Sequence, residues 1–301
     1  MTIHQATTPA DSSGNSTKDK GPYHPILQAY VADNNLSSPE AATTIASTTL
    51  SPPASGESLE DKLTHLWRLI LDLAIQNPAH QDKLVSLLTA LSHLPDATAP
   101  RADEDEDAKS PLTVHDMRVW QDLPMLGWEI RHRWNDSVPA PSSTPGTKET
   151  EERAAAIARI VNVNRFVARL VATHEPVFRP HAWFALVTLR RALETPWERM
   201  SPEDPLAAWV PAAAVWVEVL GAEIYGWEEE YAAGPGVGAR GRGGPLWKGK
   251  HGFCRERWGL WRERFGEVAG MEGEDEGVRS VAREAERRMK GIEAGVGGVD
   301  R

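Results

Sequence analysis

The chain has 301 residues, of which 41% are hydrophobic and 25% charged, proportions typical of a globular protein. Its formal net charge of −10 argues against a general affinity for nucleic acid, because nucleic-acid phosphates favour basic surfaces. A single cysteine, Cys254, excludes an internal disulfide and a cysteine-ligated zinc site. Each of the twelve tryptophans can bury about 150–250 Å². We therefore expect most of them in a core, with an aromatic binding groove as the alternative.

The N-terminal residues 1–22 are polar and rich in Ser and Thr. They contain neither an apolar signal core nor an Arg-rich amphipathic pattern, which predicts a cytoplasmic or nuclear protein that is not secreted. Their composition predicts a disordered tail.

N-terminal helices are predicted for residues 23–95. Ser38, followed by a proline, favours a helix start. Over 58–77, and again over 84–94, apolar residues recur every three or four positions, which places them on one face of a helix. Joined by a short turn at Pro78, these two helices are predicted to form a leucine-rich hairpin with its stripes buried together.

Two spacers interrupt the pattern. Residues 96–112 are acidic and are predicted to be a linker, because like charges repel and do not enter a core. Residues 137–150 are rich in Pro, Ser and Thr and are predicted to be irregular. Between the spacers we expect a short amphipathic helix capped by Asp122. Its apolar side is expected to carry Leu126, Ile130 and Trp134.

A Trp-rich helix bundle is predicted for residues 113–295, forming one domain with residues 23–95. Its longer helices are expected at about 151–174, 182–194, from Val210 onward, 254–268 and 277–292. The helix that begins at Val210 is the most apolar, but Glu218 and Glu223 interrupt it. A carboxylate near the middle of a bilayer costs about 2.5–3.5 kcal/mol. This helix is therefore expected to be a core helix, and no membrane association is predicted.

No segment shows the sustained period-two alternation of a strand. The predicted fold class is therefore all-α, with a leucine-rich helical hairpin packed on a Trp-rich helix bundle.

Two glycine-rich sequences are similar to phosphate-binding loops. Residues 236–241 match G-x-G-x-x-G, and residues 244–251 differ from a Walker A loop only in having His251 where Ser or Thr would stand. Both kinds of loop follow a strand in nucleotide-binding folds. Because no strand is predicted before either sequence, no nucleotide or other cofactor is expected.

The chain shows no constellation typical of a catalytic or metal site. Its ten histidines include no H-E-x-x-H and no compact cluster. Cys254 precedes Arg255 near a helix start, where charge and helix dipole would favour a thiolate, but no base is identifiable. We predict no catalytic residue and no metal ligand. Asn162 and Asn164 interrupt the apolar stripe of the long helix, and we expect them to tie helices together or, alternatively, to face a small cavity.

Two surface patches are candidates for interaction. One is the helix between Trp120 and Trp134. The other is the basic segment 240–264, which holds eight Lys or Arg against two Glu in an otherwise acidic chain. This segment either pairs with the chain's own acidic helices or binds a polyanion. The candidate interaction residues are Trp128, Trp134, Lys248, Lys250, Arg255 and Arg257.

Three motifs together carry a resemblance. They are W-x-D-L-P at 120–124, V-P-A-A-A-V-W at 210–216 and G-P-L-W-K-G-K at 244–250. With their flanking segments, they resemble an uncharacterised family of filamentous-fungal proteins, a domain of unknown function, over about residues 25–290. The resemblance implies an all-helical domain and supplies no catalytic residues.

The leading hypothesis is a non-enzymatic helical binding or scaffolding protein with a protein partner. The alternative is an enzyme or small-molecule binder with a pocket inside the bundle, for which polar groups would have to converge on one cavity. Candidates for that role are Asn162, Asn164, His181 and Glu218. A lesser alternative is polyanion binding through the basic segment 240–264, although nucleic acid is not the expected partner.

Overall fold

The computed structural model describes residues 21–33, 35–52, 56–100, 109–142, 146–203, 205–231 and 241–296. Within these ranges the chain forms ten α-helices, three short 3-10 helices and four very short strands, which confirms the predicted helical class. The predicted tail lies outside the described residues except for its last two positions. The acidic residues 103–107 of the predicted linker and residues 236–240 of the first glycine-rich sequence also lie outside them.

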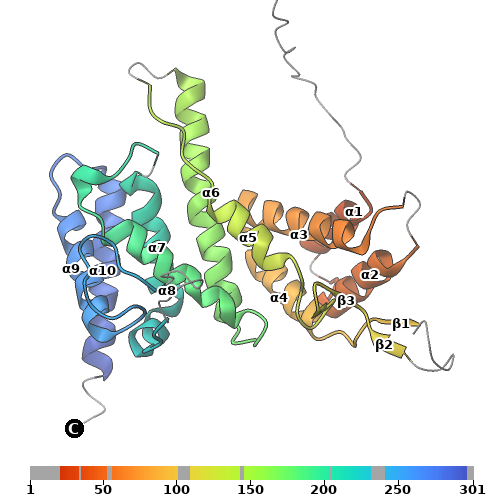
Figure 1. Cartoon of the computed structure of the whole chain (residues 1–301). Helices are drawn as coiled ribbons and strands as arrows, with labels where there is room; N and C mark the ends of the chain where they lie inside the picture. Colours follow the sequence, from red (N-terminus) through yellow and green to blue (C-terminus); the bar gives the residue numbers. More distant parts are fainter. Residues whose placement is uncertain are drawn as a thin grey trace, which may run out of the picture.

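One long helix, α6 (Thr147–Val171), runs through the middle of the molecule (Figure 1). On one side of it lie the N-terminal helices α1 (Tyr23–Ala32), α2 (Ser38–Leu50), α3 (Leu59–Gln76), α4 (Gln81–Ser92) and α5 (Leu126–Trp134). On the other side lie α7 (Trp183–Leu193), α8 (Leu206–Gly226), α9 (Arg255–Ala269) and α10 (Glu276–Val296). Buried apolar residues from both sides form one cluster.

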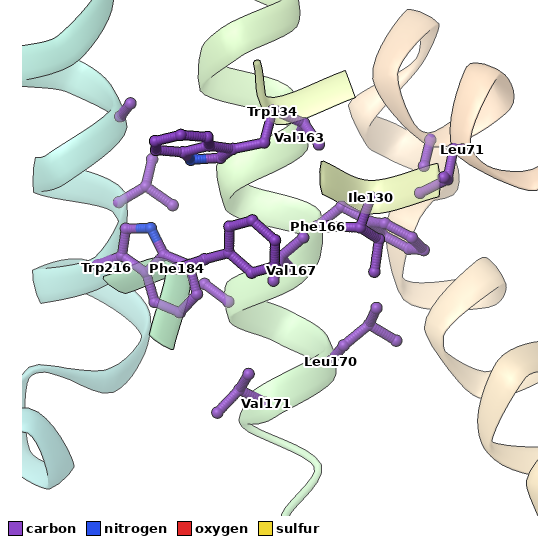
Figure 2. Packing of buried hydrophobic residues seen from close by; sticks show 14 of the residues in the cluster. Leu71, Ile130, Trp134, Val163, Phe166, Val167, Leu170, Val171, Phe184 and Trp216 are labelled. Atoms are coloured by element: carbon purple, nitrogen blue, oxygen red, sulfur yellow. The ribbon is translucent and has the colours of Figure 1, made fainter. Parts of the chain in front are cut away.

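The middle of α6 is buried on two sides, which explains why its apolar stripe is broad. Figure 2 shows Phe166 of α6 pointing toward Leu71 and Ile130 on the side of the N-terminal helices. Trp134 and Trp216 lie against the opposite side of the helix (Figure 2). All five side chains are at most 8% exposed. Helix α6 thereby joins the two groups of helices through one apolar core.

Helices α2 and α3 each begin with a reciprocal capping box. The Ser58 hydroxyl accepts from the Asp61 backbone N–H while Asp61 accepts from the backbone N–H of Ser58. The corresponding pair at α2 is Ser37 and Glu40, so the cap lies one residue before the expected Ser38. In addition, α4 packs chiefly on α2 and α3 packs on α6, whereas the sequence predicted that α3 and α4 would bury their stripes mainly against each other.

Four short strands depart from the expectation that no sheet is present. Strand β1 (Thr98–Pro100) pairs antiparallel with β2 (Lys109–Pro111), and β3 (Thr113–Val114) pairs antiparallel with β4 (Met117–Arg118). The first pair lies in the predicted linker. Because each strand has only two or three residues, no alternation was long enough to be read from the sequence.

Helix α8 is the one described helix that is long and apolar enough to cross a membrane by length and composition alone. A core helix has the same properties, and α8 packs among α6, α7, α9 and α10. It begins four residues before the expected Val210, so Pro211 lies inside the helix and not at its first turn. Its missing N–H leaves one carbonyl in the preceding turn without an intrahelical donor.

Candidate interaction surface around Trp128

One of the twelve tryptophans is exposed to solvent, and the other eleven are at least partly buried. Seven are buried: Trp67, Trp120, Trp134, Trp209, Trp216, Trp258 and Trp261. Four are partly buried: Trp183, Trp197, Trp227 and Trp247. Trp128 alone is exposed, with 62% of its surface accessible. The expectation of core packing therefore holds for most of the tryptophans, and Trp128 is the exception.

The helical repeat explains why Trp128 points outward. Leu126, Ile130 and Trp134 recur every four residues and are buried, as predicted. Trp128 lies midway between the first two and therefore on the opposite face. This spacing places Trp134 on the buried face, so it is not part of the predicted interaction surface. Its indole Nε1 donates to Thr188 Oγ1 (3.0 Å) and to Asn164 Oδ1 (3.3 Å) inside the core.

The segment before α5 has an unusual backbone. Leu123 (φ 44°) and Met125 (φ 71°) are left-handed although neither is glycine, and Met125 occupies the N-cap of α5. Asp122, the expected cap, instead accepts a hydrogen bond from the backbone N–H of Arg118 at 2.7 Å. The Pro124 carbonyl accepts from the indole Nε1 of buried Trp67 at 2.7 Å. Left-handed non-glycine residues cost about 1–3 kcal/mol each and persist only where surrounding contacts fix them.

Charged side chains hold α5 to α3. Glu129, which is 7% exposed, accepts from Arg68 at 3.1 Å and from Arg133 at 3.0 Å. Arg133 also donates to Asp72 of α3 at 3.0 Å. Two guanidinium groups and two carboxylates thus alternate along this edge. These ion pairs therefore hold α5, the helix that carries Trp128, in a fixed position on α3.

A tight hairpin supplies the neighbours of Trp128. His115 (φ 52°) and Asp116 (φ 61°) form the two-residue turn between β3 and β4, and positive φ at both positions is the type I′ geometry. The His115 ring lies 5.4 Å from the Trp128 ring, and its Nε2 lies 3.3 Å from a Glu60 carboxylate oxygen. Met117, on the far side of the turn, is 39% exposed. An aromatic and a thioether side chain therefore share this surface.

A pocket of about 170 Å³ opens beside Trp128. It lies between the β3–β4 turn, the start of α5 and the short helix η2 (Arg179–Ala182). His181 lines it and packs against Gly127, where a Cβ atom would come within 3.2 Å of the imidazole. Burial lowers the pKa of His181 to about 4, so the ring is neutral near neutral pH. The volume is comparable with an apolar cavity of about 150 Å³ that takes up benzene.

Two of the four predicted basic residues bind groups of the chain itself. Arg257 is fully buried and pairs with Glu194 at 2.7 Å, so it is not part of an interaction surface. Lys250 donates to the Glu228 carbonyl at 2.7 Å. Arg255 is exposed and lies over the Tyr225 ring at 5.2 Å, and Lys248 is exposed. Of the four predicted basic residues, two therefore remain on the surface.

The Walker-like sequence binds a carboxylate of the chain itself. The Gly244 N–H donates to Glu194 Oε2 at 2.7 Å, and the Leu246 N–H donates to the Glu194 carbonyl at 3.0 Å. Gly243 and Gly249 are required because a Cβ atom at either position would come within 2.4 Å of the Trp247 ring. Close packing around Glu194 and Trp247 thus accounts for these glycines. Of the G-x-G-x-x-G match, only Gly241 lies within the described residues.

The polar residues proposed to converge on a bundle pocket do not meet. Asn164 is fully buried, and its Oδ1 accepts from Thr188 at 2.8 Å and from Trp216 at 2.9 Å. Asn162 donates to the Ile75 carbonyl at 2.8 Å. Glu218 instead pairs with Arg165 at the surface, and His181 lines the pocket beside Trp128. Both asparagines therefore tie helices together, which was the first of the two expectations.

The surroundings of Cys254 do not favour the thiolate that its position at a helix start suggested. The residue is the N-cap of α9, but burial raises the pKa of its thiol and disfavours a thiolate. Within the described ranges, no group of three or more His, Cys, Asp or Glu side chains is placed to hold a metal ion.

Sequence reasoning missed three parts of these sites. Glu194 appeared only as the last residue of an apolar helix, although a lone carboxylate there was a signal for a buried partner. His115 and Met117 reach the surface around Trp128 because a two-residue turn lies between β3 and β4. His-Asp is not a preferred sequence for such a turn, so the turn was not predicted.

A family model described as a protein of unknown function (DUF3632) matches residues 67–265. The match begins in α3 and ends in α9, so it contains the Trp128 surface and the Glu194–Arg257 pair and is narrower than the expected 25–290. No curated protein and no solved structure matches the chain. Because the match covers well over half of the length of the chain, the chain belongs to the DUF3632 family of proteins of unknown function.

Proposed function

We propose that this protein is a non-enzymatic, cytoplasmic or nuclear binding or scaffolding protein whose partner is another protein. The carrying observation is the 62% exposure of Trp128 on a helix fixed by charged contacts on its other side. Tryptophan is enriched among the residues that dominate binding energy at protein interfaces. An exposed indole on a firm support loses little conformational entropy when it binds.

The surroundings of Trp128 define the kind of partner. The pocket of about 170 Å³ fits one large aliphatic or aromatic side chain, while Met117 extends the apolar surface beside it. Arg118 and Asp122 form a polar rim, paired at 3.4 Å. An apolar centre with a charged rim is the usual anatomy of a protein–protein interface. The expected partner therefore presents one large apolar side chain from its surface.

Affinity capture with matched variants tests this proposal. The full chain, the Trp128→Ala variant and the Leu50→Ala variant are used as bait in lysate from the source cells, with quantitative mass spectrometry. Leu50 is 44% exposed on α2, and its removal controls for loss of exposed apolar surface. A partner that binds the unchanged chain and Leu50→Ala but loses at least about tenfold with Trp128→Ala supports the proposal. Equal capture by all three baits contradicts it.

The two alternatives predict other outcomes. A polyanion-binding protein would bind nucleic acid with an affinity that falls steeply with salt and is lost when Lys248 and Arg255 become Glu. A small-molecule binder would carry a co-purifying metabolite that Trp128→Ala leaves in place. Folding of each bait is checked by thermal unfolding, because Trp128 contributes little to the core and its removal is expected to change stability by about 0.5 kcal/mol or less.

A further inference from the structure

A second pocket, of about 800 Å³, lies next to the Trp128 surface, and Pro180 lines both pockets. Its walls come from the connection between α6 and α7 and from the segment that follows α8. Three of its lining residues are the partly buried aromatics Trp183, Trp227 and Tyr231. Nothing in the Trp128 proposal uses them.

Local contacts hold the aromatic walls in place. Trp227 packs edge-on against Phe253 with ring centroids 4.9 Å apart, and Trp183 packs in the same way against Phe184 at 5.6 Å. The backbone N–H of Tyr231 donates to the His251 carbonyl at 2.7 Å. These contacts fix the two indole rings and the backbone of Tyr231 before any ligand binds, which reduces the entropy lost on binding.

Carboxylates outnumber cations in the lining. Glu175 and Glu229 contribute two negative charges, and Arg179 contributes one positive charge. Glu175 is already engaged by His93 at 3.0 Å, which leaves Glu229 as the carboxylate available to a ligand. Burial and, to a smaller degree, the charge of Glu229 raise the pKa of Tyr231, which is consistent with that carboxylate lying near the phenol.

Aromatic rings together with a carboxylate favour a particular ligand chemistry. The ring faces carry negative potential and attract cations, and recognition of alkylated ammonium groups is a recurrent use of such arrangements. A small ammonium ion would lose strong hydration in an apolar-walled pocket, whereas a methylated ammonium group presents an apolar surface and a diffuse charge. We propose that the pocket formed by Trp183, Trp227, Tyr231 and Glu229 binds an organic cation with an alkylated ammonium group.

The positive charge of Arg179 allows a test of whether the pocket binds a cation or an anion. A cation in the pocket is repelled by the Arg179 guanidinium, whereas an anion would be held by it. The Arg179→Gln variant therefore strengthens binding of a cation and weakens binding of an anion. The Glu229→Gln variant has the opposite effect on each ligand. Both side chains are exposed, so neither substitution removes a core contact.

The experiment is isothermal titration calorimetry on the full chain with choline as the probe. The comparison ligands are 3,3-dimethyl-1-butanol, which has the same shape without the charge, and benzoate as an organic anion. Choline is expected to bind at least about tenfold more tightly than its neutral isostere. Trp227→Ala and Glu229→Gln should each weaken choline binding by about fivefold or more, while Arg179→Gln strengthens it.

A matched control is Glu152→Gln, which removes one exposed carboxylate near the other end of α6. At 1.5 Å per residue it lies about 28 Å along the helix from Val171 at the pocket, so choline binding should not change. Thermal unfolding verifies that each variant folds. Equal binding of choline and its isostere overturns the proposal, as does absence of choline binding in the millimolar range. Binding of benzoate that is lost in Arg179→Gln overturns it as well.

Discussion

Glu194 and Arg257 lie 63 residues apart in the chain and form an ion pair at 2.7 Å in which neither side chain is exposed. Glu194 is the C-cap that follows α7, and Arg257 lies in the first turn of α9. Arg257 also donates to the carbonyls of Gly241 and Gly252 at 3.0 and 2.7 Å, and Glu194 accepts from Trp261 at 2.7 Å. One buried pair thus joins two helices and also holds the segment between α8 and α9 at Gly241 and Gly252.

Removing one member of this pair should be strongly destabilising. Arg257→Met leaves the Glu194 carboxylate buried without its main partner and should lower the free energy of unfolding by about 3–5 kcal/mol. The double variant Glu194→Gln with Arg257→Met should lose less than the sum of the single changes, because neither charge is then left unpaired. Urea unfolding measures all three. The control is Lys148→Met at an exposed pair, where a change of about 0.5 kcal/mol or less is expected. A similar small change for Arg257→Met would refute this account of the pair.

Asn164 should be far more sensitive than its neighbour Asn162. Its Oδ1 accepts from Thr188, Trp216 and Trp134, and Asn164→Leu leaves Thr188 and Trp216 without this acceptor, while Trp134 keeps its bond to Thr188 Oγ1. We expect a loss of about 3 kcal/mol or more, since each unsatisfied group costs about 1–3 kcal/mol. Asn162→Leu removes a single partly buried hydrogen bond to Ile75 and should cost about 1 kcal/mol. Equal losses in chemical denaturation would show that the shared acceptor is unimportant.

His181 predicts a stability change with pH. Burial lowers its pKa from 6.5 to about 4 in the folded chain, so below about pH 6.5 the unfolded chain binds a proton that the folded chain does not. Stability is therefore retained above that pH and lost progressively toward pH 4. We expect a loss of about 1–2 kcal/mol between about pH 7 and pH 5. His181→Gln lacks this component, so its unfolding free energy should fall less over the same interval. Parallel pH profiles for the two proteins would contradict the assignment.

Cys254 should be slow to react in the folded protein. The thiol is buried, with 7% of the residue exposed, and burial raises its pKa. With a thiol-reactive chromogenic disulfide at mildly alkaline pH, reaction of the folded chain should be at least about tenfold slower than reaction in denaturant. Because this is the single cysteine, the absorbance change reports on it alone. Reaction at the unfolded rate would indicate an accessible thiolate.

Hydrophobic periodicity predicted the helices well where one side is clearly apolar. The inner stripe of α5 follows from spacing, and that spacing also explains why Trp134 belongs to the core although it was grouped with Trp128 as a surface residue. The start of α5 was not predictable in this way. The left-handed Met125 takes the N-cap position, and Asp122 accepts a hydrogen bond from the backbone N–H of Arg118 instead. Tertiary contacts thus override the usual preference for Asp as an N-cap.

Charge patterning was less informative about the sites. A run of basic residues in an acidic chain indicates either a binding surface or internal pairing, and only the fold shows that Arg257 is buried on Glu194. The pocket of about 800 Å³ was also not predictable, because Trp183, Trp227 and Tyr231 come from two segments that the fold brings together. Exposure of Trp128, in contrast, follows once Leu126 and Ile130 are assigned to the core.

The most direct test of the proposed partner surface is site-specific photo-crosslinking in the source cells. Benzoylphenylalanine replaces Trp128 in one chain and the exposed Leu50 in another, and crosslinked products are identified by mass spectrometry after purification. If Trp128 is the centre of the interface, the first chain forms one discrete crosslinked product with a defined protein and the second does not. The same products from both positions, or none from position 128, would contradict a partner-binding role for this surface.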